Sequence, residues 1–244
     1  MNSKQKLTFL GHLKELRSSI FRMVIAFTIA VPIGYLLTDS AITILKNLTP
    51  HVQLIYTEVA EMLGAYLKVT IGIAFILSFP YFLYEIVTFI NPALTRNERK
   101  YLYILLPLIL CCFVLGAAFG YFVLLPPALN FLLTFGADIA TPMIKVSNYI
   151  NIVVNLLFWI GMCFEIPLII YFLTKIGIIK AEWLSRYRKL AIILAFVLGA
   201  IITPTFDPVN QTLVAVPIIL LYEFGIVLSK LARKKEKAAA ATVT

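Results

Sequence analysis

The 244-residue chain is 61% hydrophobic and only 14% charged, with a formal net charge of +9. A soluble domain has about a quarter of its residues charged, so this composition excludes an ordinary soluble protein and predicts an integral membrane protein. Apolar runs recur along the whole length, and no polar stretch is long enough for a separate soluble domain. We therefore expect one polytopic membrane domain over residues 1–231 and a basic, disordered tail over 232–244.

The chain begins with an amphipathic segment, "FLGHLKELRSSI", over residues 9–20. Its apolar side chains recur at helical spacing, at Phe9, Leu13, Leu16 and Ile20. The other face is charged, and Glu15 is the one carboxylate among cations up to Arg22. No small-residue cleavage site follows the next apolar run, so we expect a retained span and not a removable signal peptide.

Six apolar runs follow as candidate membrane spans: 20–37, 65–90, 101–125, 149–176, 190–202 and 212–228. Four are long enough for a hydrocarbon core of about 30 Å. The fifth would rise only about 20 Å as a helix, and the sixth is at the lower limit of length. The sequence predicts an all-α integral membrane protein with six transmembrane helices, of which the fifth and sixth are short.

The basic residues are distributed unequally between the two sides of this six-span arrangement. Of the 21 lysines and arginines, 18 fall on the side of both termini, and the exceptions are Lys46, Lys68 and Lys145. Positive charge is retained on the cytoplasmic side of membrane proteins, so we expect both termini in the cytoplasm. The net charge is then explained by topology and by anionic lipid headgroups, and nucleic acid is not needed as a partner.

Motifs for catalysis or metal binding are absent from the sequence. There is no P-loop, GxSxG or HExxH pattern. Cys111, Cys112 and Cys163 have no CxxC or metal-ligand spacing and are interpreted as core packing. We therefore expect no enzyme activity, no metal and no cofactor.

A second lone carboxylate, Glu98, lies in the cytoplasmic stretch "FINPALTRNERKYL" at 89–102. One interpretation is a capping box, in which Glu98 reaches back to the Thr95 amide. The other is that Glu15 and Glu98 together bind a ligand with two guanidinium groups, because carboxylates and arginine form planar, bidentate pairs.

Three further acids lie inside predicted spans. Glu165 is deep in the fourth, and an intramembrane carboxylate is costly enough to be a functional candidate by default. The alternative is a protonated, hydrogen-bonded group that joins helices. Glu85 and Glu223 are nearer the cytoplasmic ends, where we expect them to snorkel or to pair with Lys230 or Arg99.

Four motifs occur in order along the chain: "HLKELR" before the first span, "FINPALTRNER" in the second loop, "FEIP" in the fourth span and "TPTFDPVNQT" before the sixth. Together they resemble the TatC family, the receptor subunit of the twin-arginine protein translocase, from about residue 9 to 231. The loop in the last motif is slightly longer than the family's usual form. The resemblance implies six helices in a concave, glove-like arrangement and a cytoplasmic site for the paired arginines of signal peptides on folded cargo.

The resemblance also assigns roles to residues and names partners. The signal-peptide site would comprise Glu15, Glu98, Arg17, Phe89, Pro92 and Leu94. Arg17 would orient the peptide or anchor the protein to lipid, and Glu165 would line the concave face. Asp207 and Gln211 would contact partner helices of the TatA and TatB type. Further expectations are self-association, a bacterial cytoplasmic (inner) membrane location and export driven by the proton-motive force.

One other class of function remains open on the residues alone. A proton-coupled small-solute transporter could use Glu85, Glu165 and Glu223 as a relay. Solute uptake by the isolated protein would favour this alternative, whereas selective binding of twin-arginine peptides would favour the receptor.

Overall fold

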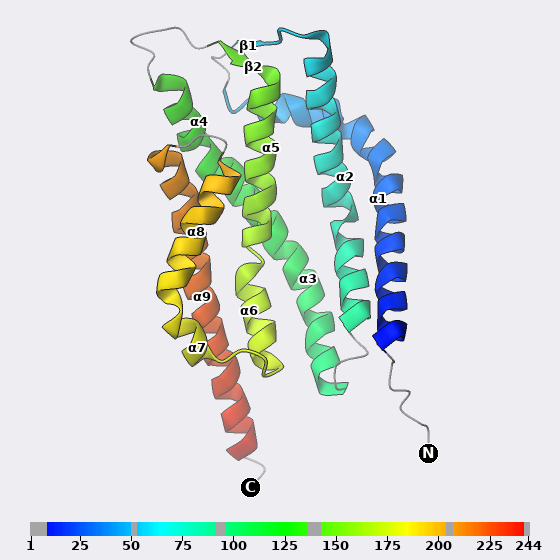
Figure 1. Ribbon diagram of the computed structural model, residues 1–244, viewed down its shortest axis with the longest axis vertical. Helices are drawn as coiled ribbons and strands as arrows, with labels where there is room; N and C mark the ends of the chain where they lie inside the picture. Colours follow the sequence, from blue (N-terminus) through cyan, green and yellow to red (C-terminus); the bar gives the residue numbers. More distant parts are fainter. Residues whose placement is uncertain (1–8, 50–52, 91–95, 136–142, 204–206, 242–244) are drawn as a thin grey trace.

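The computed structural model describes residues 9–49, 53–90, 96–135, 143–203 and 207–241; the side chains of residues 9, 10, 12, 13, 96–104 and 233–241 are outside this description. Helices make up almost all of it (Figure 1). In chain order the elements are α1 (Phe9–Lys46), β1 (Leu54–Ile55), α2 (Val59–Ile90), α3 (Arg96–Phe119), the π-helical η2 (Gly120–Leu124), α4 (Leu125–Thr134), β2 (Ile144–Lys145), α5 (Val146–Cys163), α6 (Ile166–Lys175), α7 (Ala181–Arg186), α8 (Arg188–Ile202) and α9 (Pro208–Ala241).

Two short strands are the exception to the all-α expectation. β1 and β2 pair in parallel, with Leu54 opposite Ile144 and Ile55 opposite Lys145. They join the α1–α2 connection to the α4–α5 connection at one end of the molecule (Figure 1). The start of α1 and the end of α9 both lie at the opposite end (Figure 1).

Five helical runs in the described residues are long and apolar enough to cross a membrane: Lys14–Lys46, Val59–Ile90, Leu105–Thr134, Val146–Lys175 and Pro208–Ala232. α8 has 15 residues, so it rises only about 22 Å. It is too short to cross a core of about 30 Å unaided. The predicted shortness of this helix is confirmed, and that it forms a fifth span stays a prediction.

The prediction of a short sixth span is wrong. The apolar part of α9 runs over Pro208–Ala232, which is 25 residues, and the helix continues to Ala241. Polar Asn210 and Gln211 lie inside its first turns, so the hydropathy of the sequence places the start of the span too late. The lysines, glutamate and alanines after 232 have high helix propensity, which explains why the helix continues.

The third span continues through a π-helical turn and does not break. The Pro126-Pro127 pair indicates an interruption, because neither residue has an amide hydrogen for the helical ladder. In the structure both prolines lie in the first turn of α4. η2 accommodates them by a wider turn, in which the Leu125 amide donates to the Gly120 carbonyl five residues earlier. The helix therefore continues to Thr134.

The core is centred on α5. Its buried side chains recur at helical spacing, at Tyr149, Ile150, Val153, Leu156 and Ile160. They pack with buried residues of neighbouring helices, among them Leu125, Leu129, Ala195, Ile202, Val214 and Ile218. The Tyr149 hydroxyl donates a 2.6 Å hydrogen bond to the Leu45 carbonyl at the end of α1. α5 thus connects the α1–α2 side of the molecule to the α8–α9 side.

Candidate functional site

Three helix ends with sequence-predicted site residues lie at the same end of the molecule. α1 begins there, α2 ends there and α3 begins there (Figure 1). α2 packs against both α1 and α3, so the three helix ends are neighbours in space. This end is opposite the β1–β2 pair (Figure 1).

The structure places some of the predicted residues at this end and leaves others undescribed. Glu15 is half-buried on α1, Arg17 is exposed one half-turn later, and Phe89 is half-buried in the last turn of α2. Glu98 belongs to the first turn of α3, but its side chain is outside the described residues. Pro92 and Leu94 lie outside them altogether, as does Thr95 of the predicted capping box.

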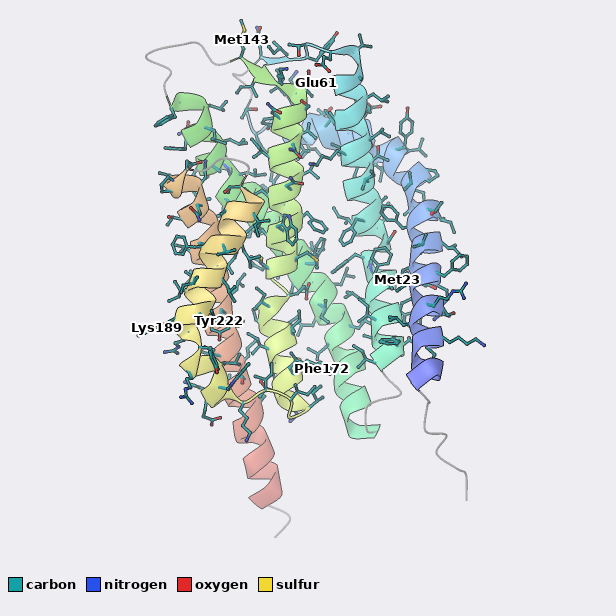
Figure 2. The ribbon with its side chains drawn as sticks, viewed as in Figure 1. Met23, Glu61, Met143, Phe172, Lys189 and Tyr222 are labelled. Carbon is teal, nitrogen blue, oxygen red and sulfur yellow. The ribbon has the colours of Figure 1, made fainter. Side chains whose placement is uncertain are left out.

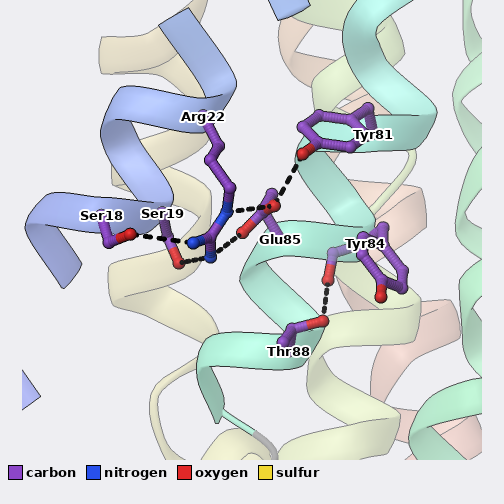
Figure 3. A network of polar contacts seen from close by, with 7 residues as sticks. All are labelled: Ser18, Ser19, Arg22, Tyr81, Tyr84, Glu85 and Thr88. Atoms are coloured by element: carbon purple, nitrogen blue, oxygen red, sulfur yellow. Dashed lines mark hydrogen bonds and ion pairs between the residues drawn. The ribbon is translucent and has the colours of Figure 1, made fainter. Parts of the chain in front are cut away.

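An ion pair that the sequence analysis missed joins α1 to α2 near this end (Figure 3). Arg22 donates two hydrogen bonds to Glu85, each 2.7 Å, from Nε to Oε1 and from Nη2 to Oε2. The Ser18 and Ser19 hydroxyls accept from the same guanidinium, at 2.8 and 3.1 Å. The Tyr81 hydroxyl donates to Glu85 Oε1 at 2.9 Å. The carboxylate is 3% exposed and the guanidinium side chain 44% exposed.

The described partners of the other two intramembrane acids differ from those expected. Glu85 pairs with Arg22, and Glu223 pairs with Arg188 at 2.9 Å. The side chain of Arg99 lies outside the described residues. An acid in an apolar run is expected to pair with a cation. Arg22, at the start of the first span, was the feature of the sequence that could have indicated the pair with Glu85. The sequence does not reveal which helices are neighbours, so it does not identify the pair.

Glu165 lies at the junction between α5 and α6 and is 5% exposed. Pro167 causes this junction, because it has no amide hydrogen to continue the ladder of α5. The Phe113 amide of α3 is close to the carboxylate. Neither carboxylate oxygen has a hydrogen-bond partner of normal geometry in the described chain. The described contacts thus do not support a helix-joining hydrogen bond, and a buried carboxylate without a partner is costly.

Asp207 and Gln211 make contacts inside the chain at the start of α9. Asp207 caps the helix: Oδ1 accepts from the Asn210 amide at 2.6 Å, and Oδ2 from the Asn210 side chain at 3.1 Å. Gln211 Nε2 donates to the Phe196 carbonyl of α8 at 2.9 Å. Both contacts have structural roles, because they set the start of α9 and its attachment to α8.

At the strand end, polar side chains join α2 to α5. Glu61, near β2 in Figure 2, accepts a 2.7 Å hydrogen bond from the Ser147 hydroxyl. Two turns further along α2, Lys68 donates to the Asn151 side chain. A cavity of about 570 Å³ lies beside these contacts, with Glu58 and Lys145 also in its wall.

Metal-ligand clusters are absent from the described residues, where no three His, Cys, Asp or Glu side chains come together. Cys163 is buried, as the core-packing interpretation requires. Cys111 is exposed on α3, so that interpretation is wrong for it. The fold and its polar groups define a polytopic helical membrane protein whose charged candidate site lies at the helix ends, on the side of both termini.

Comparisons with known proteins narrow this class to one family. The family model described as "Sec-independent protein translocase protein (TatC)" matches residues 11–217. The chain is 40% identical to the Sec-independent protein translocase protein TatC of Aquifex aeolicus (strain VF5), over 93% of this chain and 96% of the relative. It is 37% identical to the protein of that description from Carboxydothermus hydrogenoformans, over 94% and 96%.

A solved structure agrees with these sequence matches. The crystal structure of the twin-arginine translocase receptor TatC superposes with a TM-score of 0.82 at 40% identity, covering 91% of this chain and 99% of that one. The chain belongs to the TatC family. Members of this family are protein translocase components in membranes and are not enzymes.

Proposed function

We propose that this protein is the receptor subunit of a twin-arginine translocation system, which binds the signal peptides of folded cargo and nucleates the translocase for export driven by the proton-motive force. The observation that supports this proposal most directly is the gathering of three helix ends, those of α1, α2 and α3, on one side of a TatC-family fold. Each of these ends contributes residues to the candidate site.

Carboxylate chemistry explains how such a site would select its ligand. Glu15 and Glu98 would each accept the planar fork of one guanidinium, which lysine cannot reproduce because its ammonium is a point charge. Phe89, Pro92 and Leu94 would line the peptide beside them. Arg17, exposed on α1, would repel a peptide with a single positive charge or attract anionic lipid.

The distribution of basic residues supports the orientation proposed for this site. Both termini and the α2–α3 and α6–α7 connections would face the cytoplasm, and the strand end would face the outside of a bacterial inner membrane. Twin-arginine peptides would then reach the Glu15 side without crossing the membrane.

Partner binding is proposed for other parts of the molecule. α8 is short and α9 begins with polar residues, so single-span subunits of the TatA and TatB type would dock near Gln211 and Asp207. Because both side chains have internal partners, these residues would hold the α8–α9 surface in shape. Self-association within the receptor complex is part of the same proposal.

Glu165 would supply polarity inside the membrane. It is buried in the isolated chain and its carboxylate oxygens have no partner of normal geometry among the described residues. A group in this state favours hydration or an incoming polar partner, because burial without hydrogen bonds is unfavourable.

The transporter alternative is disfavoured by the ion pairs. A proton relay needs carboxylates that gain and lose protons in sequence. Glu85 is held by a bidentate guanidinium, and Glu223 by Arg188. Each of these two carboxylates is therefore bound to an arginine side chain, an arrangement typical of a structural ion pair.

Peptide binding to the purified protein in lipid nanodiscs tests the proposal. We expect a twin-arginine signal peptide to bind, and its twin-lysine counterpart to bind about tenfold or more weakly, since charge-assisted hydrogen bonds contribute roughly 1.5–3 kcal/mol. Equal affinity for the two peptides would contradict the receptor proposal. Solute uptake by vesicles with this protein alone would support the transporter.

A further inference from the structure

We propose that the Arg22–Glu85 pair is a positioning device, which holds the cytoplasmic half of α1 in register with α2 and so sets Glu15 beside the end of α2. The inference rests on the proposed function only for the identity of the ligand. The inter-helix geometry itself comes from the contacts of Arg22 and Glu85.

Helical spacing connects the ion pair to the candidate site. Glu15, Ser19 and Arg22 recur at intervals of three and four residues, so they share the face of α1 that meets α2. On α2, Glu85 and Phe89 are four residues apart and share the opposing face. Where Arg22 is level with Glu85, Glu15 lies about 10 Å further toward the helix ends, beyond the level of Phe89.

Apolar packing between α1 and α2 is sparse in this half. Between residues 14 and 31 of α1, only Ser19 and Ala30 are buried. Phe27 is half-buried, with its ring 6.5 Å from that of Phe82 on α2. Most other large apolar side chains of this stretch are exposed, at Leu16, Ile20, Phe21, Val24, Ile25 and Ile29. Facing lipid, they gain nothing from one register of the two helices over another, since lipid tails are as apolar as these side chains.

Two prolines separate this half of the α1–α2 pair from the other. Pro32 lies inside α1 and Pro80 inside α2, and each removes one backbone hydrogen bond and allows the helix to bend. Beyond them, the helices are joined by the buried hydrogen bond between the Thr38 and Thr70 hydroxyls, at 2.8 Å. That contact lies beyond both prolines, so the register on the near side depends on the contacts made there, among which the Arg22–Glu85 pair is the bidentate one.

The chemistry of the pair suits this task. Two parallel hydrogen bonds set the distance and the angle between guanidinium and carboxylate, whereas an ammonium would set only the distance. Ser18 and Ser19, which are on α1 with Arg22, orient the guanidinium. Tyr81, which is on α2 with Glu85, orients the carboxylate (Figure 3). Loss of Arg22 would leave a buried carboxylate unpaired, and the two helices would separate or slide to hydrate it.

The test combines a distance between helices with peptide affinity. Cys111, Cys112 and Cys163 are first replaced by alanine, and spin labels are attached to cysteines introduced at the exposed positions Lys14 and Ile86. The Arg22→Leu and Arg22→Lys variants are compared with the parent in nanodiscs. Arg188→Leu, which breaks the other described ion pair, is the matched control.

We expect one narrow distance distribution in the parent and a broad one in Arg22→Leu, with affinity for the twin-arginine peptide weakened roughly tenfold. Arg22→Lys should recover part of both, and Arg188→Leu should change neither. A narrow distribution in Arg22→Leu, or a broad one with unchanged affinity, would overturn the proposal. If the parent does not prefer the twin-arginine peptide, the proposed ligand is wrong, and the spin-label distances still decide whether Arg22 sets the position of α1.

Discussion

Gly34 on α1 lies directly against the backbone of Thr70 on α2: a β-carbon at position 34 would be 2.8 Å from the Thr70 carbonyl oxygen. One turn further, Thr38 shares its buried hydrogen bond with the Thr70 side chain. Small residues allow close approach of helix backbones in lipid, where packing and not the hydrophobic effect drives association. This contact holds together the halves of α1 and α2 nearer the β1–β2 pair.

A Gly34→Ala substitution should therefore destabilise the protein. The added methyl group meets backbone atoms that cannot rotate away, and overpacking of this kind lowers the free energy of unfolding by about 1–3 kcal/mol. Gly64→Ala is the matched control, because nothing lies within 4 Å of a β-carbon there. Alanine should stabilise that helix by up to about 1 kcal/mol. Denaturant unfolding in detergent measures both, and equal stability of the two variants would contradict the close contact.

The cap at the start of α9 gives a second prediction. Asp207→Ala removes the acceptor of the Asn210 amide and should lower the free energy of unfolding by about 0.5–2 kcal/mol. Asp207→Asn should retain most of the stability, because asparagine caps helices as well as aspartate does. If the Asn variant is stable but loses export, the charge of Asp207 acts on a partner and capping is not its main role.

Substitutions at Glu98 distinguish the binding interpretation of the second loop from the capping interpretation. Glutamine can still close a capping box, so capping alone predicts normal peptide affinity for Glu98→Gln and damage only for Glu98→Ala. The receptor proposal predicts that both variants, and Glu15→Ala, bind a twin-arginine peptide about tenfold or more weakly while the fold survives. Affinity titrations in detergent, with circular dichroism as the folding check, distinguish the two. Unchanged affinity of Glu98→Gln would remove Glu98 from the site.

For Glu165, the isosteric variant separates polarity from charge. If the carboxyl group acts by attracting water or a polar partner, Glu165→Gln should keep most export of a folded reporter and Glu165→Leu should lose it. If a negative charge is required, both should fail. Normal export by both variants would mean that this intramembrane acid is incidental, contrary to the general cost of such groups.

The orientation can be tested at two exposed positions. In a background without native cysteines, a cysteine at Met143 beside β2 should react with an impermeant thiol reagent added to cells. A cysteine at Ile178, between α6 and α7, should be shielded until the membrane is permeabilised. Both side chains are well exposed, at 78% and 68%, so reactivity reports the side of the membrane. Early labelling at Ile178 would overturn the cytoplasmic placement of the candidate site.

Local patterns in the sequence were sufficient for much of this protein. Hydropathy located the apolar runs and the short α8, because each apolar run needs only its own residues to be recognised. The lone carboxylates Glu15 and Glu98 were visible as single acids among cations. The ordered motifs indicated the TatC family, which the comparisons then showed.

Only the tertiary structure showed which residues on different helices contact each other. Arg22 and Glu85 are 63 residues apart, and Glu223 pairs with Arg188 because α8 and α9 are neighbours. The close approach of Gly34 to Thr70 depends in the same way on how α1 and α2 are rotated and shifted against each other. A hydropathy pattern records which segments are apolar enough to enter the membrane but not which helix lies opposite or at what height, and a salt bridge needs both to within an ångström.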